Sequence, residues 1–226
     1  MNQIMIPKFE LSSLKYPSVI NIVGAQSTNT TLTARKIINN LTSFSITTVF
    51  TNQAEDYKGL NNTTIYNDTL FLNKVVKNII RDQQKYPKTS TLIIFDQIPS
   101  LYKNYYIIPQ LLQISKSFNI ITILIDKSPE IPKNLFNYLD YSILTYSPEV
   151  SIQYKRELYK VYGQVLESYN QFDSIYRDIC QEDEDKSLLF DYTQNYYIPE
   201  KMLGWINQST KHTKLTQVPK ADHIHP

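Results

Sequence analysis

Short apolar segments that alternate with amphipathic segments constrain the fold of this chain most strongly. The apolar segments have the length of strands, and several lack polar positions, as strands buried on both faces do. They lie at residues 18–23, 45–50, 63–66, 91–95, 120–125, 141–146 and 188–190. Segments with helical spacing lie at residues 31–41, 70–86, 109–118, 150–168 and 200–206. This alternation predicts an α/β fold with a mostly parallel central sheet and helices on both faces.

Composition limits the remaining possibilities. Of the 226 residues, 42% are hydrophobic and 19% are charged, which favours one folded domain at residues 1–208 and a polar, flexible tail at 209–226. The net charge of +2 gives no strong global field, so a nucleic acid would need a local patch. The single cysteine, Cys180, excludes an intrachain disulfide framework and suits a reducing compartment. There is no leader pattern and no run of roughly 18 apolar residues, so we expect a soluble protein without a membrane partner.

The first strand leads into a polar turn with the outline of a phosphate-binding loop. Residues 20–41 read INIVGAQSTNTTLTARKIINNL, and the loop pattern is G-x-x-x-x-G-K-[ST]. Gly24 matches the first glycine and Thr31 the hydroxyl, whereas Asn29 and Thr30 stand where the second glycine and the lysine are expected. These four residues are therefore candidates for nucleotide binding. The alternative for Thr30 and Thr31 is that they cap the helix that follows.

Two aspartates follow apolar strands farther along the chain. Asp96 comes directly after the strand at 91–95, and Asp126 directly after the strand at 120–125. In open α/β sheets, ligands bind at the carboxyl ends of the strands. We therefore expect the loop that begins at Gly24, Asp96 and Asp126 to converge in space.

Four stretches of the chain resemble a known family in their order and spacing. They read NIVGAQSTNTT, TLIIFDQI, FNIITILIDKSPEIPKNLFNYLDYSIL and DKSLLFDYTQNYYIPEKMLGWIN. Together they resemble the genome-packaging ATPases of large DNA viruses, the poxvirus-type branch of the FtsK/HerA group of P-loop NTPases. The resemblance covers residues 18–207, and the later positions in register are Ile131, Pro132, Leu135, Asp140, Tyr141, Leu144, Asp191, Tyr192, Thr193 and Trp205. It implies a P-loop NTPase-like three-layer sandwich, ATP with Mg²⁺ as ligand, DNA as partner and a ring of subunits.

The resemblance also implies residue roles, from which the chain departs in several places. Thr31 and Asp96 match the residues that hold Mg²⁺, although Asp96 could instead bond to loop amides. Thr30 replaces the phosphate-binding lysine, which removes roughly 1.5 to 3 kcal/mol per charged hydrogen bond. Gln97 stands at the position of the catalytic acid and Phe136 at that of the arginine finger. These two losses are worth about 10²–10⁴ and 10³–10⁵ in rate, so we expect negligible turnover.

Asp126 and Lys127 occupy the sensor position, where the family carries a serine or threonine and a glutamine. Because Lys127 follows a neighbouring strand, it is a candidate to swing toward the phosphate site and replace the lost charge. The alternatives are an ion pair with Asp126 and a free surface position.

These features predict a catalytically defective relative of a viral DNA-packaging ATPase, with a structural or regulatory role in virion assembly or genome packaging. Its expected partners are a second copy, an active homologous ATPase or virion proteins, in the cytoplasm of an infected host cell or in the virion. One alternative is an active ATP-driven DNA translocase that uses Lys127. Another is a DNA-binding module without nucleotide, with candidate contacts among the tyrosines and lysines of residues 101–109 and 153–163. Mixed charge on a helix face explains the second stretch equally well.

Overall fold

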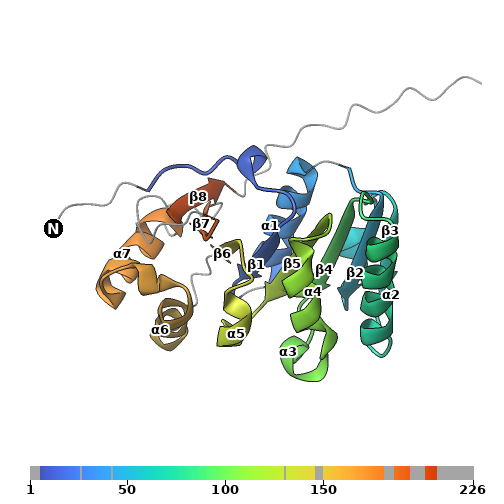
Figure 1. The fold of residues 1–226 in the computed structure, drawn as a ribbon. Helices are drawn as coiled ribbons and strands as arrows, with labels where there is room; N and C mark the ends of the chain where they lie inside the picture. Colours follow the sequence, from blue (N-terminus) through green and yellow to red (C-terminus); the bar gives the residue numbers. More distant parts are fainter. Residues whose placement is uncertain are drawn as a thin grey trace, which may run out of the picture.

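A computed structural model of the chain describes residues 6–25, 27–41, 43–129, 131–145, 150–180, 186–193 and 202–207. Its strands are β1 (Val19–Val23), β2 (Ile46–Thr51), β3 (Thr63–Tyr66), β4 (Thr91–Asp96), β5 (Ile120–Asp126), β6 (Tyr141–Thr145), β7 (Lys186–Asp191) and β8 (Leu203–Asn207). They form one eight-stranded sheet with the order β3-β2-β4-β5-β1-β6-β7-β8 (Figure 1). Neighbours from β3 to β6 run parallel, whereas β7 and β8 join antiparallel. The predicted α/β fold with a mostly parallel sheet is confirmed.

Helices connect the strands and cover both faces of the sheet (Figure 1). The α-helices are α1 (Ser27–Asn40), α2 (Leu72–Lys85), α3 (Leu101–Asn104), α4 (Ile107–Ser115), α5 (Lys133–Phe136), α6 (Ile152–Val161) and α7 (Tyr169–Cys180). Short 3₁₀ helices are η1 (Leu11–Ser13), η2 (Ala54–Tyr57) and η3 (Gly163–Val165). The helices predicted at 31–41, 70–86 and 109–118 correspond to α1, α2 and α4, although α1 begins earlier, at Ser27. None of the described helices is long and apolar enough to cross a membrane.

Alternate residues of the central strands pack into two separate cores. In β1, Val19 and Val23 belong to the core that includes residues of α2, α4, α6 and α7. Ile20 and Ile22 belong to the other core, which includes residues of α1. All four side chains are fully buried, as expected for a parallel strand covered on both faces. The arrangement is the predicted three-layer sandwich.

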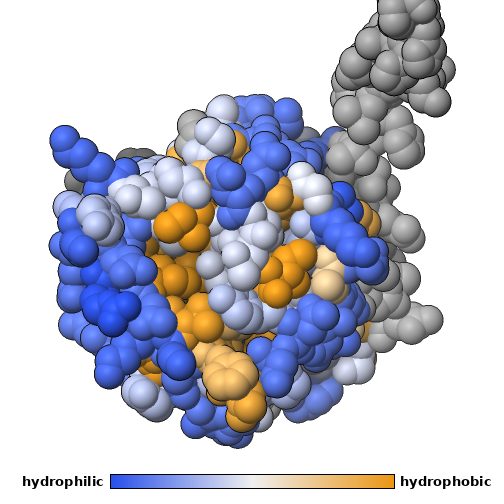
Figure 2. Space-filling model, turned by 90° about the vertical axis from the view of Figure 1, so that its right-hand side faces the viewer, coloured by the Kyte–Doolittle hydropathy of each residue, from blue (hydrophilic) through white to orange (hydrophobic). Residues whose placement is uncertain are grey.

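The amphipathic helix α2 packs on the sheet near its β3 edge. Leu72, Val76 and Ile80 are buried on one side of this helix. The face of the molecule that carries α2 and β3 is mainly hydrophilic, with hydrophobic patches toward its lower part (Figure 2). Leu70 and Phe71, which directly precede α2, are large apolar side chains that are exposed. The apolar spacing therefore identifies the buried side of α2 through Leu72, Val76 and Ile80, whereas Leu70, at the same spacing, lies before the helix and is 75% exposed.

The predicted helix at residues 200–206 is wrong, because most of this segment forms strand β8. β8 pairs antiparallel with β7, and the N-terminal segment of the chain lies along it, with the Phe9 amide donating to the Trp205 carbonyl at 2.9 Å. A Cβ atom on Gly204 would lie 3.0 Å from the Cβ of Phe9, so a glycine permits this close approach. Pairing with distant segments overrides the local helical spacing.

The predicted single helix at residues 150–168 is also wrong in its extent. α6 ends at Val161, and a separate helix, α7, follows. The chain turns at Gly163, where a Cβ atom would lie 2.6 Å from the Tyr159 ring and 2.9 Å from the Phe172 ring. The close packing of these aromatic rings against the turn therefore requires a residue without a side chain.

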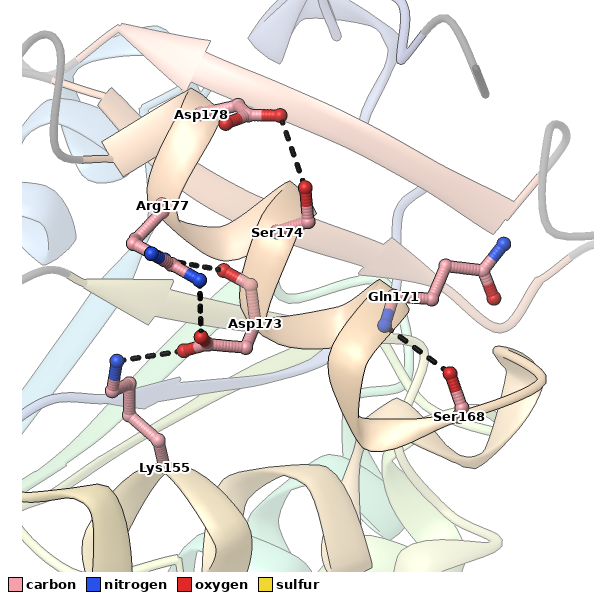
Figure 3. Close-up of polar contacts among 7 residues, drawn as sticks. All are labelled: Lys155, Ser168, Gln171, Asp173, Ser174, Arg177 and Asp178. Carbon is pink, nitrogen blue, oxygen red and sulfur yellow. Dashed lines mark hydrogen bonds and ion pairs between the residues drawn. The ribbon is translucent and has the colours of Figure 1, made fainter. Parts of the chain in front are cut away.

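A charged cluster joins α6 to α7 (Figure 3). Asp173 of α7 accepts from Lys155 of α6 and from Arg177 of α7, at 2.6 Å in both cases. The Lys155 and Asp173 side chains are only 17% and 15% exposed, so water shields this pair little. Ser168 precedes α7, and its hydroxyl accepts from the Gln171 amide at 3.3 Å, as a helix cap does.

We expect Asp173→Ala to lower the free energy of unfolding by about 1 to 3 kcal/mol, because Lys155 would be left partly buried without its partner. Asp178→Ala is the matched control, since Asp178 is exposed on the same helix and accepts only a 3.5 Å hydrogen bond from Ser174. We expect this control to change stability by less than about 0.5 kcal/mol. Urea unfolding measures both, and equal losses would contradict the structural role of Asp173.

Candidate functional site

The glycine that opens the candidate phosphate loop is required by the sheet itself. A Cβ atom on Gly24 would lie 1.8 Å from the Thr145 hydroxyl oxygen, in the neighbouring strand β6. The Gly24 amide donates to the Asp126 carbonyl at 3.1 Å. Gly24 thus ties the end of β1 to the end of β5, and its identity is explained without a nucleotide.

The two threonines of the loop lie within α1 and are turned inward. Thr30 is fully buried, and Thr31 is only 4% exposed. Since α1 begins at Ser27, neither occupies the first position of the helix, and the capping alternative is wrong. Thr31 donates to Asp96 Oδ2 at 3.5 Å, so the structure brings these two candidate residues together. The side chain of Asn29 lies outside the described part of the chain.

Asp96, at the end of β4, is surrounded by hydroxyl groups from three other elements. Its Oδ2 accepts from Tyr57 of η2 at 2.9 Å and from Thr51 of β2 at 3.4 Å, in addition to Thr31 of α1. Its Oδ1 has no hydrogen-bond partner. Burial raises the pKa of the Asp96 carboxyl, and the hydrogen bonds from Tyr57 and Thr51 partly oppose this. The alternative predicted for Asp96 was hydrogen bonding to loop amides; in the structure its hydrogen-bond donors are hydroxyl groups.

Tyr57 is a site residue that the sequence analysis missed. Burial and the neighbouring Asp96 charge raise the pKa of its phenol far above the usual value, so it remains a donor. Tyr57 lies in a short connection between β2 and β3 and belongs to no motif, so only its tyrosine identity could have drawn attention to it.

The residues at this position do not fit Mg²⁺ in the arrangement described. Magnesium requires near-octahedral oxygen ligands and usually keeps several waters. Asp96 is 1% exposed, its Oδ2 already accepts from three hydroxyls, and its Oδ1 is buried, so neither oxygen is accessible to a hydrated ion. Among the described residues there is also no group of three or more His, Cys, Asp or Glu side chains that could hold a metal.

Gln97 follows Asp96 and adopts a positive φ of 54°. Its backbone N–H donates to the Ile125 carbonyl at 2.8 Å, which fixes the turn after β4 against β5. The side-chain Nε2 is buried without a hydrogen-bond partner. A carboxamide cannot ionise near neutral pH, so Gln97 cannot accept a proton from an attacking water as an acid residue would.

Asp126 ends β5, and its carboxylate is held by Tyr102 of α3, a contact that the sequence analysis did not predict. The Tyr102 hydroxyl donates to Asp126 Oδ2 at 3.0 Å. Burial raises the pKa of Asp126 to about 7; the Asp96 charge adds to this, and the Tyr102 hydrogen bond opposes it. Lys127 is exposed, and within the described chain it makes no ion pair with Asp126. Of the three alternatives for Lys127, the structure corresponds to the surface position.

Phe136, at the expected arginine position, is part of an aromatic cluster. Its ring centroid lies 5.1 Å from that of Tyr192 and 6.0 Å from that of Tyr162. Asp140, which carries part of the family resemblance, bonds the Val19 amide and Lys116, both at 2.9 Å. These positions therefore hold the fold together.

The tyrosines and lysines proposed as DNA contacts are largely engaged within the protein. In residues 101–109, Tyr102 bonds Asp126 and Tyr105 bonds Thr69, whereas Tyr106 is 73% exposed. In residues 153–163, Lys155 pairs with Asp173, and the Leu158 and Tyr162 side chains are buried. Helix packing thus explains part of the second stretch, whereas its Arg156 and Lys160 side chains are exposed.

A cavity of about 910 Å³ lies at the carboxyl ends of β2, β4 and β5. Asp96, Gln97, Asp126 and Lys127 all line it, so the expected convergence of the two aspartates is observed. Volumes of this size are typical of sites for small molecules.

Asp126 predicts a pH dependence of stability. Its pKa is about 7 in the folded protein and about 3.9 in an unfolded chain, so between these values the folded state holds more protons. The free energy of unfolding should therefore fall as pH rises from 4 to 7, by an amount on the order of 2 kcal/mol from this group, and remain constant above. Unfolding in urea at pH 5 and pH 8 measures the change. Asp126→Asn should show a smaller loss than the natural protein, and an equal loss would contradict the burial of an ionisable Asp126.

Comparison with known proteins gives matches in structure only. No protein-family model matches the sequence, and no curated protein matches it. Among solved structures, the genome packaging NTPase B204 of Sulfolobus turreted icosahedral virus 2, in complex with AMPPCP, has a TM-score of 0.59 at 14% identity, over 85% of this chain and 98% of that one. The pCW3 conjugation coupling protein TcpA, with ATPγS, has a TM-score of 0.59 at 11% identity, over 83% of this chain and 62% of that one.

A third similar structure contains ATPases 2 and 3 of EssC from Geobacillus thermodenitrificans. Its TM-score is 0.54 at 14% identity, over 77% of this chain and 38% of that one. At such identities the likeness establishes the fold alone. This chain therefore shares its fold with the genome packaging NTPase B204, with TcpA and with the EssC ATPases.

Proposed function

We propose that this chain is a catalytically defective relative of viral DNA-packaging ATPases, with a structural or regulatory role in virion assembly or genome packaging. The observation that carries the proposal is the set of hydroxyl groups around Asp96. In a working site the corresponding carboxylate supports Mg²⁺ beside the phosphates. Here it is buried and bonded to Tyr57, Thr51 and Thr31.

The other positions that would supply catalysis support the same conclusion. Thr30 is neutral and buried, so it offers no charge to a triphosphate. Gln97 cannot act as a base, and Phe136 is packed against Tyr162 and Tyr192. The lost base and arginine are worth about 10²–10⁴ and 10³–10⁵ in rate, and although such factors do not simply multiply, turnover would be negligible.

The similar structures support a role beside DNA-handling ATPases. B204 is described as a genome packaging NTPase and TcpA as a conjugation coupling protein. On this basis the partners we propose are a second copy, an active homologous ATPase, virion proteins or DNA. The location we propose is the virion or the cytoplasm of the infected cell.

One observation favours a second candidate, an active ATP-driven DNA translocase. Lys127 is exposed at the cavity that Asp96 also lines, so its ammonium group is available to a phosphate there. In this candidate function, Lys127 supplies the positive charge that Thr30 lacks, but no residue replaces the base expected at the position of Gln97.

Phosphate release from ATP and Mg²⁺, with and without duplex DNA, separates the two candidates. We expect the natural protein and Asp96→Asn to release phosphate at the same background rate, because the natural Asp96 supports no catalysis. The control is Asp82→Asn, which makes the same chemical change at an exposed position of α2. Release that Asp96→Asn and Lys127→Ala both abolish, while Asp82→Asn retains it, would establish the translocase instead.

A further inference from the structure

The cavity at the ends of β2, β4 and β5 has an acidic floor. Asp96 and Asp126 contribute carboxylates from adjacent strands, β4 and β5. The walls combine apolar side chains, from Ile98, Leu101 and Ile131, and the ring of Tyr102 with polar side chains, from Asn52, Gln53 and Ser100. None of the described residues of the candidate phosphate loop lines this cavity.

When ionised, the two carboxyl groups of this floor have no positively charged partner within the described part of the chain. Asp126 Oδ2 accepts from Tyr102, but Oδ1 has no hydrogen-bond partner among the described residues. Asp96 is 1% exposed, lines the cavity, and has an Oδ1 without a partner. No described lysine or arginine makes an ion pair with either carboxylate. Like charges in a protected site repel each other, and an added cation would relieve this repulsion.

We propose that this cavity binds the guanidinium or ammonium group of an organic cation, with Asp126 as its direct partner and the charge of Asp96 behind it. The inference rests on the proposed function, because a working ATPase would keep Asp96 for magnesium. A carboxylate oxygen without a partner is the acceptor that a guanidinium or ammonium group requires.

The walls favour an organic cation over a metal ion. Two carboxylates, one of them almost fully covered, supply too few oxygen ligands for a divalent ion. The apolar side chains and the Tyr102 ring suit the methylene groups of an alkyl chain.

The lysines at the cavity narrow the ligand class further. Lys103 and Lys127 both line the cavity and are exposed, so they lie toward its mouth. They disfavour a polycation and favour a ligand whose other end carries an anionic group. The class is therefore a zwitterion, with a cationic head for Asp126 and a carboxylate or phosphate for the lysines.

The test compares free L-arginine with L-citrulline, which has the same length and the same amino and carboxylate groups but a neutral urea in place of the guanidinium. Binding to the full chain is measured by calorimetry or by NMR titration. We expect citrulline to bind about tenfold more weakly or worse, as the loss of one charge-assisted bond implies. Asp126→Asn should weaken arginine binding by a similar factor and remove the preference over citrulline.

Asp82→Asn, far from the cavity on α2, is the control and should bind arginine as the natural protein does. Thermal unfolding of each variant verifies that it is folded. Equal binding of arginine and citrulline, no detectable arginine binding, or unchanged binding by Asp126→Asn would overturn the inference. The phosphate-release assay is independent of these outcomes, so absence of arginine binding together with background hydrolysis would overturn this inference alone.

Discussion

The contact on which this account depends is the hydrogen bond from the Tyr57 hydroxyl to the Asp96 carboxylate. It brings the connection after β2 across the end of β4, where an ATPase of this fold would keep an open carboxylate. Thr51 and Thr31 donate to the same oxygen, so one carboxylate joins β2, β4 and α1. A neutral donor that remains protonated thus occupies one oxygen of this carboxylate.

Thr30 and Phe136, which stand where the family resemblance predicts a lysine and an arginine, both pack against other parts of the protein. Thr30 is buried where a lysine would have to reach out, and Phe136 completes an aromatic cluster with Tyr162 and Tyr192. Each replacement therefore has a structural role of its own.

Much of the fold could be predicted because central strands and α2 carry their own local signals. Apolar runs identified β1, β4 and β5, and the positions of Asp96 and Asp126 at strand ends followed from them. β8 could not be predicted, because its pairing with β7 and with the segment around Phe9 depends on residues distant in sequence. For the same reason Tyr57 was missed, and Tyr102 was considered only as a candidate DNA contact, since each tyrosine reaches its aspartate from another element.

The measurement that tests the central claim most directly is a calorimetric titration of ATP with Mg²⁺ into the natural protein and into Asp96→Asn. If the Asp96 carboxylate is already satisfied by hydroxyl donors, neither protein should give saturable heat at nucleotide concentrations up to about 1 mM, a bound of roughly −4 kcal/mol in binding free energy. Micromolar binding of ATP that requires Mg²⁺ and disappears in Asp96→Asn would contradict the account.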